Sequence, residues 1–244
     1  MSSLFFVDNI DSNEVQLLEN EEAHHAIKVL RLSLSEQLII SDGKNTWVSG
    51  EIIEIEKKSL KFRVDKRGSI ELSKPELIVI QAFTKSDRNK EMLELLTVSG
   101  VDQIIPWESQ RSISKWQPDS ADKWMITVKE ACKQSKRLRL PTISDPMKIE
   151  QVTDVLKNNF SVVFHEGSTN KFSNIVIPSE LEKIYVIIGP EGGITQEEVE
   201  AFKSAGASVA RLENQYCVLP TLDLLRSQLF KLNLGDGRNG LLVL

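Results

Sequence analysis

Cysteine is scarce in this sequence, with only two among 244 residues. Cys132 and Cys217 stand far apart and in no metal-ligand spacing, which argues against a disulfide framework and predicts a protein of the reducing cytosol. The first residues, "MSSLFFVDNIDSNE", show no basic segment followed by a long apolar core, so we expect no signal peptide. No apolar run approaches the roughly 18 residues that span a bilayer, and no membrane association is predicted.

Phosphate-binding and metal-binding motifs are also missing. The glycine-rich segment "IGPEGG" (188–193) lacks the Gly-Lys-Ser/Thr end of a P-loop and does not fit Gly-x-Gly-x-x-Gly. His24 and His25 are adjacent, so their side chains point apart on a helix, and no metal site is predicted. The net charge of -5 gives the whole chain no preference for nucleic acid.

The first part of the chain, residues 1–72, reads as short strands joined by turns. The segment "SDGKN" (41–45) predicts a tight turn, and "NEEAHHAIKVLR" (20–31) predicts one short helix. We therefore expect a small module that resembles a β-barrel. Its predicted strands are 3–7, 36–41, 45–55 and 59–67.

Residues 73–244 alternate between apolar strands and helices, which predicts an α/β domain with a mostly parallel sheet and helices on both faces. Gly206 follows the helical segment "TQEEVEAFKSA" and is expected to end it in a left-handed conformation. The predicted strands are 76–83, 101–106, 160–166, 183–189 and 207–212. The predicted helices are 87–100, 122–137, 195–206 and one from about residue 221.

The corner Gly189-Pro190-Glu191-Gly192-Gly193 follows the strand 183–189 and precedes a helix that Thr195 and Glu198 predict as a capping box. It lies at the carboxyl edge of the predicted sheet, where α/β proteins bind ligands. Backbone groups and one carboxylate suit a neutral or cationic ligand. An ordinary strand-to-helix turn is the alternative.

Positive charge gathers in residues 110–140, which hold eight Lys and Arg against three Asp and Glu. Such an island predicts a polyanion, above all nucleic acid, although a solvated helix end has the same composition. Arg111, Ser112 and Lys115 belong to a loop expected at the carboxyl edge, where an arginine can bind phosphate or a developing anion. His165 and Glu166 end another predicted strand at this edge, or form only a polar strand end.

Taken in order, several segments resemble the ribosomal RNA small subunit methyltransferase E family of the SPOUT superfamily. The resemblance covers nearly the whole chain, and its most specific parts are "IGPEGG" and "GVDQIIP" with the following "RS" and "KW". The matching segments are "HHAIKVLR" (24–31), "KSDRNKEMLELLTVSGVDQIIPWESQRSISKW" (85–116), "EACKQSKRLRLP" (130–141), "FHE" (164–166) and "IGPEGGITQEEVE" (188–200).

The resemblance implies a trefoil-knotted SPOUT domain over residues 73–244, a PUA-like RNA-binding barrel over residues 1–72, and a homodimer with its site at the interface. It implies transfer of a methyl group from S-adenosylmethionine to N3 of one uridine in the 16S ribosomal RNA of the small subunit. Arg111 and Arg137 are the candidate catalytic residues, and either could instead bind RNA phosphate.

The remaining site residues follow from the same resemblance. The cofactor-binding set is His165, Glu166, Ile188, Gly189, Pro190, Glu191, Gly192, Gly193, Leu212, Cys217, Val218, Leu219 and Thr221. The RNA-binding set is His25, Arg31, Arg88, Lys115, Lys133, Gln134, Ser135, Lys136 and Arg139.

One loop departs from the family pattern Leu-Gly-Pro-x-Ile/Val-Leu-Arg-Thr. Here the chain reads "LENQYCVLPT" (212–221), so that Pro220 or Val218 occupies the place of the arginine, and Gln110 replaces a usual glutamate. An rRNA-binding assembly factor that has lost catalysis is therefore the alternative function. A nucleotide-binding enzyme of another type is disfavoured by the missing phosphate motifs.

The leucines of "TLDLLRSQLFKL" (221–232) recur at helical spacing and are more than one core contact needs. They predict a dimer through this helix, and packing against the chain's own sheet is the alternative. The leucines are Leu222, Leu225, Leu229 and Leu232.

Overall fold

The computed structural model describes residues 2–72 and 74–211. Contacts divide the chain into two compact units, one of residues 1–72 with 126–140 and one of residues 73–125 with 141–244. The domain limits 1–72 and 73–244 stay a prediction.

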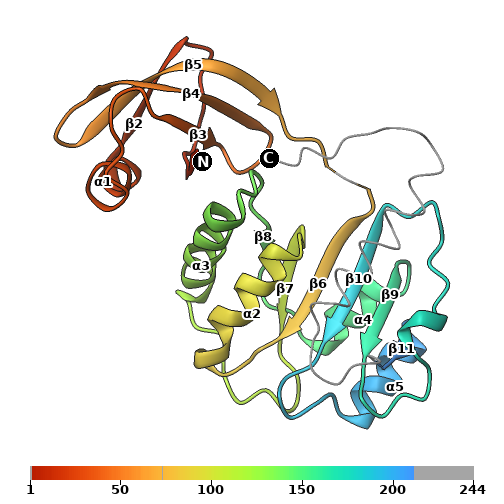
Figure 1. The fold of residues 1–244 in the computed structure, drawn as a ribbon. Coiled ribbons are helices and arrows are strands. Elements are labelled where there is room, and N and C mark those ends of the chain that lie inside the picture. Colours follow the sequence, from red (N-terminus) through yellow and green to blue (C-terminus); the bar gives the residue numbers. More distant parts are fainter. Residues whose placement is uncertain (1, 73, 212–244) are drawn as a thin grey trace. The chain divides into compact units, whose positions relative to one another are not determined.

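The N-terminal unit is a curled five-stranded sheet with one short helix (Figure 1). The strand order is β1-β3-β4-β5-β2, in which β1 runs parallel to β3 and the other pairs are antiparallel. Helix α1 (Asn20–His24) continues as a π-helix over His25–Val29. The strands are β1 (Ser3–Phe6), β2 (Val15–Glu19), β3 (Gln37–Ser41), β4 (Thr46–Ile55) and β5 (Ser59–Ser69).

The end of the charged island packs within this unit. Helix α3 (Ser120–Ser135) leads into an extended segment whose Leu140 amide donates to the Gly43 carbonyl at 2.9 Å. The Ser41 hydroxyl donates to the Leu138 carbonyl at 2.6 Å. Residues 138–140 are thereby fixed beside the predicted turn 41–45.

The C-terminal unit is built on a six-stranded sheet of order β11-β9-β10-β6-β7-β8, and every described pairing in it is parallel. Helices flank this sheet (Figure 1). The strands are β6 (Glu76–Ala82), β7 (Gln103–Trp107), β8 (Thr142–Ile143), β9 (Phe160–Phe164), β10 (Lys183–Ile188) and β11 (Ser208–Ala210). The helices are α2 (Ser86–Val98), α4 (Ile149–Leu156), α5 (Gln196–Ser204) and the start of α3, with a short 3-10 turn at Phe172–Asn174.

Alternate strand residues place two apolar faces on this sheet, because side chains in a strand point to opposite sides. Ile78 and Ile80 of β6 face helices α4 and α5, from which Val152 and Phe202 enter the same fully buried cluster. Leu77 and Val79 are also fully buried. Burial on both faces explains why these strands read as continuous apolar runs.

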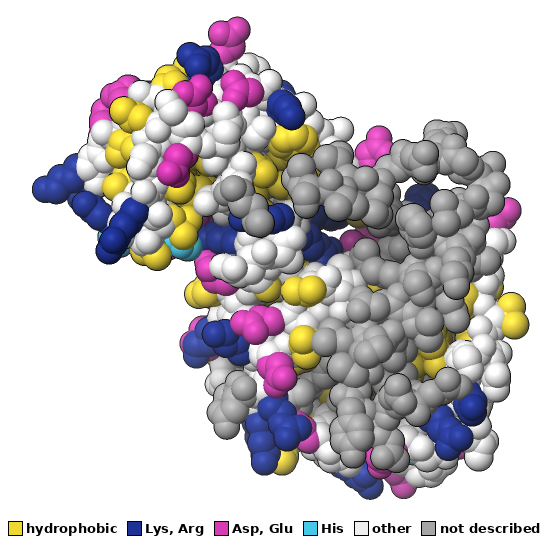
Figure 2. Space-filling view, in the orientation of Figure 1, with side chains coloured by type: hydrophobic (Ala, Val, Ile, Leu, Met, Phe, Trp, Pro, Cys, Tyr) yellow, Lys and Arg dark blue, Asp and Glu magenta, His cyan; other side chains and the backbone are white. Residues whose placement is uncertain are grey.

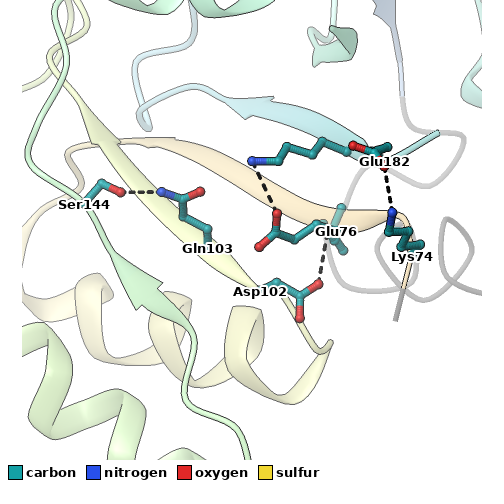
Figure 3. Close-up of polar contacts among 8 residues, drawn as sticks. Lys74, Glu76, Asp102, Gln103, Ser144 and Glu182 are labelled. Atoms are coloured by element: carbon teal, nitrogen blue, oxygen red, sulfur yellow. Dashed lines mark hydrogen bonds and ion pairs between the residues drawn. The ribbon is translucent and has the colours of Figure 1, made fainter. Parts of the chain in front are cut away.

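Polar contacts fasten the amino ends of the strands (Figure 3). Asp102 accepts the Leu77 amide at 3.0 Å, which joins the start of β7 to β6. Lys183 of β10 lies 3.5 Å from the Glu76 carboxylate of β6. These contacts fix the strand register, and the loops that bear the predicted site leave the sheet at its opposite edge.

No helix in the described part of the chain is long and apolar enough to cross a membrane. The trefoil knot expected for the C-terminal domain stays a prediction, since the chain from residue 212 on lies outside the described residues.

Candidate functional site

Three loops are bonded together at the carboxyl edge of the central strands. They follow β10, β6 and β7, which are neighbours in the sheet. The indole nitrogen of Trp107, at the end of β7, donates to the Ile188 carbonyl of β10 at 3.1 Å. The Lys85 amide, before helix α2, donates to the Glu191 carboxylate at 3.1 Å. The corner 189–193 is therefore bonded to the loop after β6, and the end of β10 just before it is bonded to the end of β7.

Two glycines of the corner are required by its geometry. Gly193 has a φ of +74° and donates its amide to the Pro190 carbonyl at 2.9 Å, closing a tight turn. Such a φ is costly for residues with a Cβ. A Cβ on Gly189 would lie 2.5 Å from the side chain of Ile194, which is buried in the core. The corner is thus a rigid, built feature of the fold.

Arg111, a predicted catalytic residue, lies directly against this corner. Its Nη1 donates to the Gly192 carbonyl at 2.9 Å, and a Cβ added to Gly192 would lie 3.3 Å from the Arg111 Cβ. Both residues are exposed. The structure therefore brings a predicted catalytic residue and the predicted cofactor corner together, from loops that are distant in sequence.

Glu198 joins the same two loops from below the surface. The predicted capping box is present, because the Glu198 amide donates to the Thr195 hydroxyl at 3.3 Å and the Glu198 carboxylate accepts the Thr195 amide at 2.9 Å. The same carboxylate also accepts the Gln110 amide at 2.7 Å and the Ser109 hydroxyl at 3.3 Å. Glu198 is only 1% exposed. The sequence predicted the cap, and nothing in it pairs Glu198 with residues 109 and 110.

Aromatic rings anchor the far end of the Arg111 loop. Trp116 stacks on Phe83 at a centroid distance of 5.8 Å and meets Trp124 edge-on at 5.0 Å. Lys115, next to Trp116, is exposed. The Ser112 hydroxyl is buried and has no hydrogen-bond partner among the described residues.

His165 and Glu166 were predicted to end a strand, and in the structure they come directly after β9, the other neighbour of β10. The His165 amide donates to the Ala210 carbonyl at 2.9 Å, which extends the pairing of β9 with β11. Glu166 is exposed. Both residues lie at the same edge as the corner.

The predicted RNA-binding residues divide by exposure, and Lys133 is an enclosed member that is paired with carboxylates. Its side chain is 11% exposed and lies 3.0 Å from the carboxylates of both Glu22 and Glu130. Burial alone lowers the pKa of Lys133, but the bonds to Glu22 and Glu130 outweigh it and raise this pKa above its usual value. The positive charge of Lys133 is therefore largely compensated by carboxylates within the N-terminal unit.

Arg139 and His25 are also partly enclosed. Nε and Nη1 of Arg139 are buried without a hydrogen-bond partner in the described ranges. The His25 ring packs edge-on against Phe5 at 6.3 Å. The Ser135 hydroxyl donates to the Ala131 carbonyl at 2.8 Å. Lys136 is half-buried, and the exposed members of the predicted set are Arg31, Arg88, Lys115, Gln134 and Ser135.

Part of the predicted cofactor site cannot be placed. Leu212, Cys217, Val218, Leu219 and Thr221 lie outside the described residues, as do Pro220 and the leucines of the predicted dimer helix. Within residues 2–72 and 74–211, no group of three or more His, Cys, Asp or Glu side chains could hold a metal ion.

Comparison with known proteins places this geometry in a family. A model of the RNA methyltransferase domain matches residues 71–218, and a model of the RNA methyltransferase PUA domain matches residues 18–65. The ribosomal RNA small subunit methyltransferase E of Mycobacterium bovis is 31% identical over 222 residues, which cover 87% of this chain and 84% of the relative. The chain belongs to the ribosomal RNA small subunit methyltransferase E family.

Other members of the methyltransferase E family agree. The protein of that name from Rickettsia conorii is 28% identical, covering 80% of this chain and 79% of the relative. The crystal structure of the family member from Neisseria gonorrhoeae, bound to S-adenosylmethionine, superposes with a TM-score of 0.82 at 21% identity, over 93% of this chain and 98% of the other. A probable rRNA methyltransferase from Porphyromonas gingivalis gives 0.75 at 26% identity, over 94% and 97%.

The predicted family and the predicted α/β fold class are confirmed by these matches. Arg111, Gly192 and Glu198 all lie within the region matched by the RNA methyltransferase model. The match to the PUA model runs from the end of β2 into β5 of the N-terminal unit. This chain is therefore an RNA methyltransferase of the methyltransferase E family with a PUA domain.

Proposed function

We propose that this protein transfers a methyl group from S-adenosylmethionine to N3 of a uridine in 16S ribosomal RNA. The observation that carries the proposal is the bond between Arg111 and the Gly192 carbonyl, which places a cation at the edge of the corner 189–193. Family membership supports methylation of ribosomal RNA. The uridine, its N3 atom and the cofactor are the finer parts of the proposal.

The corner fits S-adenosylmethionine in its chemistry. The cofactor, when bound, supplies an electrophilic methyl group on a sulfonium. Its adenine is neutral, so backbone N–H and C=O groups can bind it without a phosphate-binding motif. Gly192 is exposed and carries no side chain above Arg111, which permits close approach of a flat ring. The described residues that would hold it are Ile188 to Gly193, together with His165 and Glu166 just after the adjacent strand β9.

Arg111 is the residue we assign to the developing charge. Loss of the N3 proton leaves negative charge on the uracil ring, and a fixed cation stabilises it. Arginine has five N–H donors, of which the Gly192 carbonyl takes one. The rest of the fork suits a uracil oxygen or a neighbouring phosphate. Arg137, in the other compact unit, stays a second candidate for this role or for RNA phosphate.

RNA binding is assigned jointly to the N-terminal module and to the positive island. Residues 1–72 hold nine Lys and Arg against thirteen Asp and Glu, so the module needs positive charge from elsewhere. Residues 110–140 supply it, and we propose that cations of this island other than Lys133, which is paired with two carboxylates, contact phosphate. We further propose a homodimer through the helix that the sequence predicts from about residue 221, with the site completed at its interface.

An assembly factor without catalysis is the second candidate function. It is favoured by one feature of the sequence, the absence of arginine from "LENQYCVLPT" (212–221). Pro220 has neither charge nor N–H and cannot replace that side chain. Such a protein would still bind the small subunit and could still bind the cofactor, so binding alone does not separate the two functions.

The deciding experiment is nucleoside mass spectrometry of 16S rRNA from a deletion strain. We expect N3-methyluridine to disappear, to return with the parent gene and to stay absent with Arg111→Met, which keeps the aliphatic chain and loses the charge. Arg111→Lys, which keeps the charge and loses the fork, should restore it in part. Unchanged N3-methyluridine in the deletion strain would refute the proposed reaction.

A further inference from the structure

The buried carboxylate of Glu198 has more bonds than a helix cap requires. In a capping box the glutamate bonds the amide of the cap residue, here Thr195, which the carboxylate accepts at 2.9 Å. The Gln110 amide at 2.7 Å and the Ser109 hydroxyl at 3.3 Å come from the loop after β7, and no capping role accounts for them. Oε1 accepts from Gln110 and Oε2 accepts from both Ser109 and Thr195, so the carboxylate is shared between the loop after β7 and the start of helix α5.

We propose that Glu198 is a positioning residue for methyl transfer, which holds the Arg111 loop against the cofactor corner. The inference rests on the proposed function. Glu198 touches neither RNA nor the corner's exposed surface, since it is 1% exposed, so it acts only through the residues that it holds.

The hydrogen bonds of Glu198 and Arg111 connect the two loops at both ends. Gln110, fixed by Glu198, immediately precedes Arg111, and Nη1 of Arg111 returns to the Gly192 carbonyl at 2.9 Å. From Gly192 the chain runs three residues to Thr195, whose amide is again bound by Glu198. Arg111 therefore has a fixed backbone origin and a fixed guanidinium end, and both depend on one carboxylate.

The position of Arg111 matters because methyl transfer depends on alignment. A displacement of about 1 Å in a positioning group can lower a rate by roughly a hundredfold. Two amide bonds to a carboxylate are stronger than bonds between neutral groups, and their loss frees the loop after β7 from the corner. Of the described hydrogen bonds that join residues 109–111 to residues 189–198, only the Arg111–Gly192 bond between exposed groups would then remain.

The first test needs neither RNA nor cofactor. Amide hydrogen exchange is measured by NMR in the full-length parent, in Glu198→Ala and in Glu197→Ala, an exposed neighbour on the same helix. We expect the Gln110 and Thr195 amides to exchange at least about tenfold faster in Glu198→Ala, because each loses its acceptor. The Glu197 variant should match the parent. Unchanged protection at Gln110 in Glu198→Ala would overturn the inference.

The second test measures methyl transfer to small ribosomal subunits. We expect kcat to fall about a hundredfold in Glu198→Ala while the KM for S-adenosylmethionine changes less than about threefold. Glu198→Gln keeps one carbonyl acceptor and should fall between the parent and Glu198→Ala. It also keeps the test valid should Glu198→Ala fail to fold. A parent-like kcat in Glu198→Gln together with parent-like exchange at Gln110 would overturn the inference.

Failure of the proposed function looks different. In that case the parent itself transfers no methyl group to the small subunit, while the exchange measurement still decides whether Glu198 joins the two loops. A fall in kcat that is matched by an equal rise in KM for S-adenosylmethionine would show that Glu198 supports only the corner, and would also refute the positioning of Arg111.

Discussion

Gly193→Ala tests whether the corner 189–193 is a binding element or only a turn. Gly193 has a φ of +74°, and a Cβ there would meet only Nη1 of Arg111, at 3.8 Å. The cost is therefore backbone strain, about 1–2 kcal/mol for a residue with a Cβ. The melting temperature should fall by roughly 2–8 °C, since 1 kcal/mol corresponds to about 2–4 °C in proteins of this size.

Cofactor affinity should fall as well, for a reason specific to this position. The strain is relieved by rotating the peptide between Gly192 and Gly193, and that peptide bears the carbonyl bonded to Arg111. Rotation moves the carbonyl away from the guanidinium and changes the surface of the corner. We expect S-adenosylmethionine to bind roughly tenfold more weakly, which corresponds to about 1.4 kcal/mol in calorimetric titration.

Gly206→Ala is the matched control. Gly206 has a φ of +96°, a Cβ there would meet nothing within 4 Å, and the residue closes helix α5 rather than the corner. Its strain and its loss of melting temperature should resemble those of Gly193→Ala, while cofactor affinity stays within about twofold of the parent. Equal cofactor affinities in the two variants would refute the role of the corner.

Three further predictions follow from the structure. Gly192→Val should abolish S-adenosylmethionine binding in calorimetry, because its Cβ would lie 3.3 Å from an arginine side chain and its methyl groups would cover the corner; parent-like binding would leave only a turn. Burial raises the pKa of the Cys132 thiol to about 11, which favours the neutral form, so iodoacetamide at about pH 8 should label Cys132 roughly a hundredfold more slowly in the folded protein than in urea; rapid labelling of the native peptide, followed by mass spectrometry, would contradict this. Reversing the charge at Arg137 and Arg139 should weaken RNA binding and should flatten the slope of log K against log salt by roughly 0.7–0.9 per lost phosphate contact. As the control, reversing the charge of the two exposed lysines between β4 and β5 should change the RNA affinity and the slope less. An unchanged slope in the Arg137 and Arg139 variant would reject the island as the RNA contact.

Most of the central sheet could be predicted because its strands are buried on both faces and therefore read as continuous apolar runs. The strand β2 could not, because its alternation is inverted. Val15 and Leu17 are 43% and 48% exposed, whereas Gln16 is buried and bonded to Asp11. In β2 a hydrogen-bonded polar side chain is buried and two apolar side chains are exposed. The alternation of polar and apolar residues therefore does not identify which face of the strand packs on the core. Helix α4 and the two-residue strand β8 were also missing from the predicted elements.

The corner of the site could be predicted because its residues are contiguous and unusual. Its glycines, the capping box and the carboxyl-edge position all follow from local sequence. It was harder to predict which cations of the positive island bind RNA, because composition does not show which of them are already paired with carboxylates. Lys133 is bound by Glu22, which lies far away in the sequence, and the partners of Glu198 at residues 109 and 110 are equally distant. Long-range pairing of this kind is set by the folded topology.

These pairings decide which cation of the predicted set has a positive charge that no neighbouring carboxylate compensates. Lys133 lies between two carboxylates, so its field is largely cancelled within its own unit. Arg111 is bonded instead to a neutral carbonyl. The nearby Glu198 carboxylate, in the first turn of helix α5, accepts from the amides of Gln110 and Thr195 and from a serine hydroxyl, and no described guanidinium bonds to it. The positive end of that helix offsets the buried negative charge. Within residues 2–72 and 74–211, Arg111 is therefore positioned by a hydrogen bond and has no ion pair that would neutralise it. We infer from this that its positive charge remains directed to an anion above the corner, as transfer to a deprotonated uracil requires.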